Sequence, residues 1–290
     1  MMEKTQCPCY TVNDGENGMS VLRYTFMNDT LFKMFFVKHP DLLKKLVAPI
    51  LNISLSSIKK FEIRNPEMPP ENLGDKFCRL DINMEVDGQR IDLEIQQRRE
   101  GGDFPERSLY YWAREYSTAL PENEKYTVLP RTIVISILGF NLFPCKEYHS
   151  EFQALEVTRH TLLTDKFVMH YFELPKIPKV VNTDNILELW LSLFKAETEE
   201  DLEELAKMEV PEMEEAIKVY HQITVTPEFR ERERLYSKAR HDEASALHHA
   251  RQEEREKWQN VVAEKDEALA EKDILIEKLQ AQLNGLVKSE

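Results

Sequence analysis

The sequence predicts an α/β domain followed by an all-helical C-terminal region. Residues 80–96 (LDINMEVDGQRIDLEIQ) alternate apolar and polar residues on both sides of an Asp-Gly pair, which is typical of a β-hairpin. The run TIVISILGF, which starts at Thr132, is rich in β-branched residues, as in a buried strand. From Asn185 onward the chain carries only helical patterns.

The elements before the hairpin are two helices and a short strand. Residues 1–24 are polar and contain several Asn, Asp and Gly, so they are expected to form a flexible N-terminal segment. Asn28 or Asp29 is expected to cap a first helix, and a second helix is expected from Asp41. The segment IKKFEIRNP predicts a short strand that a proline ends.

After the hairpin, strands and helices alternate. Asp103 is expected to cap a helix through ERSLYYWAREYSTAL, and strands are expected from Thr132, Glu151 and Lys166. Three amphipathic helical segments and one long helix follow from Asn185.

The end of the chain carries a short heptad repeat. An apolar residue recurs at every seventh position: Val262, Leu269, Ile276 and Leu283. Leucines lie three residues after the last two of these, whereas Lys265 and Lys272 hold the equivalent earlier positions. The repeat predicts a short coiled coil, and hence a homo-oligomer that forms through the C-terminal helix.

Composition places limits on the class of protein. The chain has 290 residues and a formal net charge of −14, and residues 195–290 hold 15 Lys and Arg against 25 Asp and Glu. This balance argues against nonspecific binding of polyanions, although a basic groove in the first two thirds of the chain stays open. The sequence contains neither a long apolar run nor an apolar leader, so we expect a cytoplasmic protein without a membrane span.

The hairpin sequence brings two carboxylates together. With Asp87-Gly88 as a two-residue turn, residues whose numbers sum to 175 face each other, so Asp81 lies opposite Glu94. Like charges so placed are destabilising, and a divalent cation would resolve the conflict. Gln96 projects from the same face and could orient a water molecule. The other interpretation is that this face is merely solvated.

These residues resemble a known nuclease motif. Asp81 followed by Glu94-Ile95-Gln96 is similar to the Asp and Glu-x-Lys of PD-(D/E)XK nucleases. More narrowly, the chain resembles the Rpn family of recombination-promoting nucleases, also called PD-(D/E)XK nuclease family transposases. NDTLFKMFF, DGQRIDLEIQ, FPERSLYYWAREY, RTIVISILGFNLF and LLTDKFVMHYFELPK follow in family order, and the similarity covers about residues 25–240.

The resemblance implies a restriction-endonuclease-like core, with a mixed central β-sheet flanked by helices. The domain division that follows has four parts: a flexible segment 1–24, a nuclease-like domain 25–195, a helical extension 196–250 and an acidic helix or coiled coil 251–290.

The resemblance also implies an Mg²⁺-dependent DNA endonuclease linked to recombination or mobile elements, with Mn²⁺ as a possible substitute ion. Asp81 and Glu94 would hold the metal, and Gln96 would complete the catalytic set. Gln96 stands where the wider superfamily usually has Lys, and a neutral amide cannot stabilise charge on a phosphate as an ammonium does. The alternative is a weakly active or inactive nuclease-derived protein that binds DNA or serves as a scaffold, assembling through its C-terminal helices.

Five further residues are candidates for accessory roles. Asp29 and Lys33 could supply a ligand or a phosphate contact, or else be a helix cap and a solvated lysine. Asp165 matches a family position that is either a turn or part of the active site. Arg107 and Arg114 lie two turns apart on one helix face and could bind the DNA backbone, or else form salt bridges with nearby glutamates.

Overall fold

The computed structural model describes residues 20–65, 82–99, 102–120 and 122–287. The chain divides into two compact units, residues 1–235 and residues 236–290. Within the described part, unit 1 is a mixed α/β domain, as the sequence predicted, and unit 2 continues the last helix. The predicted domain boundaries after residues 24, 195 and 250 stay predictions.

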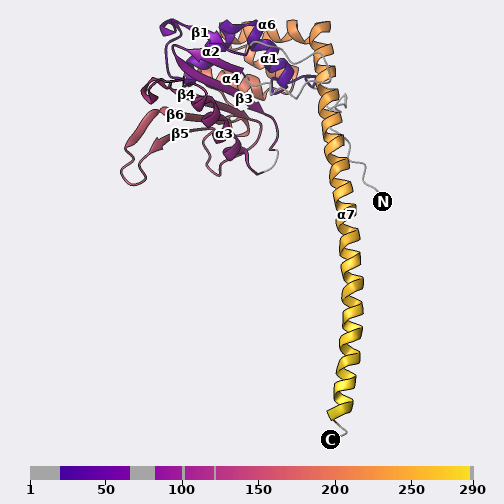
Figure 1. Ribbon diagram of the computed structural model, residues 1–290. Coiled ribbons are helices and arrows are strands. Elements are labelled where there is room, and N and C mark those ends of the chain that lie inside the picture. The colour runs from indigo at the N-terminus through magenta and orange to yellow at the C-terminus, as the bar shows by residue number, and fades with distance from the viewer. Residues whose placement is uncertain (1–19, 66–81, 100–101, 121, 288–290) are drawn as a thin grey trace. The chain divides into compact units, whose positions relative to one another are not determined.

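The described residues contain seven α-helices and six strands (Figure 1). The helices are α1 Asp29–Lys38, α2 Pro40–Ile50, α3 Phe104–Ser117, α4 Ile186–Lys195, α5 Glu199–Ala206, α6 Pro211–Thr224 and α7 Pro227–Val287. The strands are β1 Phe61–Ile63, β2 Ile82–Val86, β3 Gln89–Gln96, β4 Thr132–Leu138, β5 His149–Leu155 and β6 Leu162–Glu173.

One mixed sheet forms the centre of unit 1, with the strand order β1-β2-β3-β4-β6-β5. The β3–β4 and β4–β6 pairs are parallel, and the other three pairs are antiparallel. The strands β3 and β4 therefore lie in the interior of the sheet, where both of their faces are covered. Burial on both faces explains why TIVISILGF carries apolar residues almost without interruption.

The β2–β3 hairpin has the predicted turn and register. Asp87 and Gly88 have φ angles of 48° and 80°, as the two central residues of a type I′ turn require. Asn83 faces Asp92 and Glu85 faces Arg90, as the sequence predicted. The predicted pairing of Asp81 with Glu94 lies outside the described residues.

The ion pairs around the hairpin differ from those suggested by the register. Glu85 binds Lys60 Nζ at 2.9 Å, and this bond lowers the pKa of the Glu85 carboxyl group. Arg90, which faces Glu85 across the hairpin, donates instead to the side chain and the carbonyl oxygen of Glu115, which lies on α3. The cross-strand register fixes which Cα atoms face each other. Long charged side chains, however, can form ion pairs with residues of elements that lie elsewhere in the sequence.

Two hydrophobic clusters cover the two faces of the sheet. The larger cluster contains Ile91, Leu93 and Ile95 of β3 together with buried residues from α1, α2, α4, α5 and α6. The smaller cluster lies on the other face, where Phe104 of α3 packs with Val134 and other residues of β4 and β6. Alternate residues of β3 therefore point toward α3, and these are the polar ones.

The strands β5 and β6 form a hairpin in which a partly buried histidine, His149, lies against a buried one, His170. His149 Nε2 and His170 Nδ1 lie 3.0 Å apart and share a hydrogen bond, so one ring nitrogen donates and the other accepts. Burial lowers the pKa of both imidazoles, and that of His170 falls to about 4 despite the opposing charge of Glu151. Both rings are therefore neutral at pH 7.

The histidine pair predicts a loss of stability in mild acid. Between pH 6.5 and pH 4 the unfolded chain binds a proton at His170 and the folded chain does not, so the free energy of unfolding falls as the pH falls through this window. The expected loss is about 3 kcal/mol by pH 4. Thermal unfolding at several pH values should show a shallower dependence in His170→Gln than in the wild type. The matched control is His248→Gln, at an exposed position of α7; an equal slope in all three proteins would contradict the prediction.

The last helix, α7, is continuous over 61 residues. It begins in the core of unit 1, where Phe229 packs edge-on against Tyr24 at 4.9 Å between ring centroids. A single helix does not by itself make the predicted coiled coil, which stays a proposal. Among the described residues, no helix is both long enough and apolar enough to cross a membrane.

Candidate active site

The candidate site lies where β3 faces α3. Glu94 is 2% exposed and Asp92 is 6% exposed, although both are acidic, and Gln96 follows on the same face at the end of the strand. The apolar residues that alternate with them point into the larger core cluster. The alternation that makes β3 a strand therefore also fixes the direction of its carboxylates.

Arg107 approaches this row of polar groups from α3. Its Nη2 atom donates to Gln96 Oε1 at 3.0 Å and lies 3.6 Å from Glu94 Oε1. Gln96 Nε2 donates to the carbonyl oxygen of Arg98 at 3.0 Å, so both ends of the Gln96 amide are engaged. The Arg107 side chain also lies over the ring of Phe104 at 4.9 Å. These contacts hold the guanidinium beside the buried carboxylate.

The neighbouring strands add hydroxyl groups on the same face. In the parallel register Glu94 faces Ser136, and Ser136 faces Tyr171. The Ser136 hydroxyl is buried and makes no hydrogen bond within the described part of the chain. Tyr171 shares a 2.7 Å hydrogen bond with Ser108 of α3. Burial raises the pKa of the Tyr171 hydroxyl, and the negative charge of Glu94 adds to this effect.

The hydrogen bond between Tyr171 and Ser108 should contribute measurably to stability. Tyr171→Phe removes a buried hydroxyl that joins α3 to the sheet, and we expect the free energy of unfolding to fall by about 1 kcal/mol. Urea unfolding of the variant tests this. Tyr110→Phe, on the exposed side of α3, is the matched control and should unfold at the same urea concentration as the wild type. Identical midpoints for both variants would contradict the expectation.

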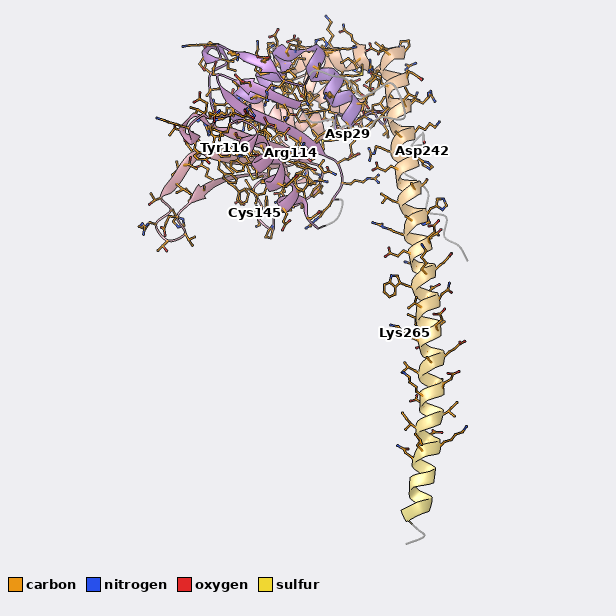
Figure 2. All side chains as sticks on the ribbon, viewed as in Figure 1. Asp29, Arg114, Tyr116, Cys145, Asp242 and Lys265 are labelled. Atoms are coloured by element: carbon orange, nitrogen blue, oxygen red, sulfur yellow. The ribbon has the colours of Figure 1, made fainter. Side chains whose placement is uncertain are left out.

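The structure brings some of the predicted site residues together. Arg107 lies within contact distance of both Glu94 and Gln96. Asp81 lies outside the described residues. Arg114 is exposed, two turns further along α3 (Figure 2).

The other accessory candidates lie on α1 and β6. The side chain of Asn28 accepts from the Leu31 amide and caps α1, so Asp29 is the first residue of the helix. Lys33 is buried rather than solvated, which corrects one of the two interpretations of that residue. Asp165 is exposed in an irregular part of β6, six residues before Tyr171, and the structure does not bring it to Glu94.

The sequence reasoning missed several residues of this site. Asp92 faces Asn83 across the hairpin, but the Asn83 side chain accepts from Asn65 Nδ2 at 3.0 Å. A second acid two positions before Glu94 was a signal that the whole strand face is polar. Ser136 and Tyr171 gave no such signal, because their nearness to Glu94 depends on a parallel register that no local pattern encodes.

The donor atoms fit a divalent cation in part. Carboxylate and amide oxygens are the ligands that Mg²⁺ and Mn²⁺ prefer, and Glu94 offers such an oxygen beside the unbonded hydroxyl of Ser136. Within the described ranges, however, no three His, Cys, Asp or Glu side chains are grouped as a metal site requires. A cation at Glu94 therefore needs a further ligand from elsewhere, and the sequence offers Asp81.

A mixed α/β domain of this topology, with a buried glutamate and an adjacent amide at the end of a central strand, is consistent with a PD-(D/E)XK fold. The sequence model of the family described as "PD-(D/E)XK nuclease family transposase" matches residues 26–250, and the chain belongs to this family. No protein of curated function and no solved structure shows significant similarity to the chain. Membership associates the chain with nucleases linked to mobile elements, and PD-(D/E)XK nucleases generally use divalent metals.

Proposed function

We propose that this protein is an Mg²⁺-dependent DNA endonuclease that acts in recombination or in the movement of mobile elements. The observation that carries the proposal is the buried carboxylate of Glu94, held at the end of a central strand with Gln96 and Arg107 around it. Burying a carboxylate costs free energy unless a cation or hydrogen bonds compensate it. A buried glutamate that faces polar side chains is therefore suited to binding a metal ion.

In this proposal Asp81 and Glu94 hold Mg²⁺ or Mn²⁺. When bound, the cation polarises the phosphate and lowers the pKa of a coordinated water molecule. Glu94 presents its oxygen from a rigid interior strand, because both neighbours of β3 are paired in the sheet. Gln96 fixes the position of Arg107 through its amide oxygen.

Arg107 supplies the positive charge that Gln96 lacks. Its guanidinium lies next to Glu94, so in our proposal it contacts the phosphate that is cleaved rather than a distant part of the backbone. Charge that develops on a phosphate oxygen is stabilised by a guanidinium already in place. Arg114, exposed on the same helix, is proposed to contact the flanking DNA backbone.

A plasmid-relaxation assay tests the proposed activity. Wild-type protein with Mg²⁺ or Mn²⁺ should nick or linearise supercoiled DNA, and a chelator should stop the reaction. Asp81→Ala should be inactive, whereas the matched control Asp242→Ala, at an exposed position of α7, should cleave as the wild type does. Equal cleavage by the wild type and Asp81→Ala would contradict the proposal, and a wild-type protein that does not cleave would favour the nuclease-derived scaffold.

We also propose that the protein forms a homo-oligomer through α7. The observation that favours this is the row of large apolar side chains that unit 2 leaves exposed, from Trp258 to Leu279.

A further inference from the structure

The described part of α7 in unit 2 exposes an apolar stripe. Its members are spaced by four, seven, seven and three residues, and each is about half exposed: Trp258, Val262, Leu269, Ile276 and Leu279. A shallow hollow on the helix surface, lined in part by Trp258 and Val262, lies on the same stripe. This spacing places all five side chains on one face of the helix.

We propose that the apolar stripe packs against the same stripe of a second copy of this chain, with the two helices antiparallel. The proposal does not depend on nuclease activity, since it concerns only residues of unit 2. Three observations favour this partner and this direction: the positions of the lysines in the heptad, the match between the stripe and its own reverse, and the residues that flank the stripe.

The lysines occupy only one of the two core positions of the heptad. The first core position holds Val262, Leu269 and Ile276, whereas the second, three residues later, holds Lys265 and Lys272 before Leu279. Parallel helices place each core residue opposite its own copy, which would stack two pairs of lysines inside the contact. Antiparallel helices place the first position opposite the second, so every lysine faces an apolar residue. Figure 2 shows Lys265 on α7, within the segment concerned.

The apolar stripe is complementary to the same stripe of a second helix that runs in the opposite direction. With the two-fold axis between residues 270 and 271, Val262 faces Leu279, Leu269 faces Lys272, and Ile276 faces Lys265. Each contact then occurs twice, as an interface between identical surfaces requires. The lysine stems pack along the apolar side chains while their ammonium groups reach water.

The residues that flank the stripe favour the same direction. Val261 and Ala268 lie on one flank, whereas Asp266 and Asp273 lie on the other. Parallel helices would set each aspartate against an apolar flank, but antiparallel helices bring the apolar flanks together and widen the contact. The acidic flanks then also meet, but at an exposed edge where water and salt screen the repulsion.

Distance measurement between two spin labels tests the direction. The full-length chain is used, with the native cysteines changed to serine and a single label at Ala250→Cys, an exposed position outside the stripe. Sedimentation should first show a dimer. Twice the helical rise from residue 250 to the axis then predicts labels about 60 Å apart. A monomer, or labels closer than about 25 Å as adjacent parallel helices would give, overturns the proposal.

Disulfide formation tests the register. In the same cysteine-free background, Val262→Cys protein is mixed with Leu279→Cys protein that carries a larger affinity tag, and the mixture is oxidised. The expected product is the mixed disulfide, with little of either pure one. Pure Val262→Cys disulfides would show a parallel pair, and the absence of any disulfide would contradict this register. Plasmid cleavage by the same proteins reports separately on the proposed nuclease.

Discussion

Replacing Glu94 with Gln is expected to lower the rate of metal-dependent DNA cleavage by about 10³-fold while the chain stays folded. The substitution keeps the shape of the side chain but removes a charged oxygen ligand. A metal ion contributes several kcal/mol of transition-state stabilisation, and each 1.36 kcal/mol is a factor of ten in rate. Single-turnover cleavage of a supercoiled plasmid with Mg²⁺ measures the loss.

The control for this variant is Glu253→Gln, at an exposed position of α7, which should cleave at the wild-type rate. Circular dichroism should show the same helix content in all three proteins, so that a loss of rate is not a loss of fold. A Glu94→Gln protein that is folded and cleaves within a few-fold of the wild type would mean that the buried glutamate is structural.

Arg107→Ala is expected to lower the same rate by about 10²-fold, because removing one preplaced donor to a developing charge typically has an effect of this size. Arg107→Lys should recover only part of the rate, since an ammonium keeps the charge but not the two-pronged geometry of the guanidinium. Gln96→Lys in the Arg107→Ala background should also recover part of the rate, because it returns a cation to the end of β3.

Two other arginines separate this role from general attraction of DNA. Arg114→Ala should weaken DNA binding and reduce the dependence of binding on salt concentration. The rate of cleavage at saturating protein should change less than it does in Arg107→Ala. Arg159→Ala, in the exposed turn between β5 and β6, should change neither. If Arg107→Ala affects only binding, as Arg114→Ala does, the guanidinium does not act on the cleaved phosphate.

Local patterns were sufficient to predict the hairpin. The Asp87-Gly88 pair fixes the turn, and the alternation on either side fixes the register, so the facing pairs of β2 and β3 could be read directly from the sequence. The direction of Glu94 and Gln96 follows from that register alone.

The surroundings of Glu94 could not be predicted in the same way. Arg107 was a candidate for the DNA backbone, and only the packing of α3 on the sheet shows that its guanidinium meets Gln96. The hydroxyls of Ser136 and Tyr171 reach the same face through parallel pairings between strands that lie far apart in the sequence. Such pairings depend on tertiary packing, which short-range periodicity does not encode.

The continuity of α7 could not be predicted from local sequence patterns either. The sequence patterns suggested a helical extension up to residue 250 and an acidic helix or coiled coil over residues 251–290, and the structure joins the two in one helix from Pro227 to Val287. The residues between the two patterns are mostly charged and good helix formers, so nothing interrupts the backbone hydrogen bonds. The charged composition of the chain changes near residue 250, but the helical conformation does not.

The measurement that tests the central claim most directly is Mn²⁺ binding, followed by the paramagnetic signal of the free ion as protein is added. We predict that the wild-type protein binds Mn²⁺, that Asp81→Ala and Glu94→Gln each lose this binding, and that Asp242→Ala retains it. Wild-type protein that binds no Mn²⁺, or variants that bind it as tightly as the wild type, would contradict the assignment of a metal to Asp81 and Glu94.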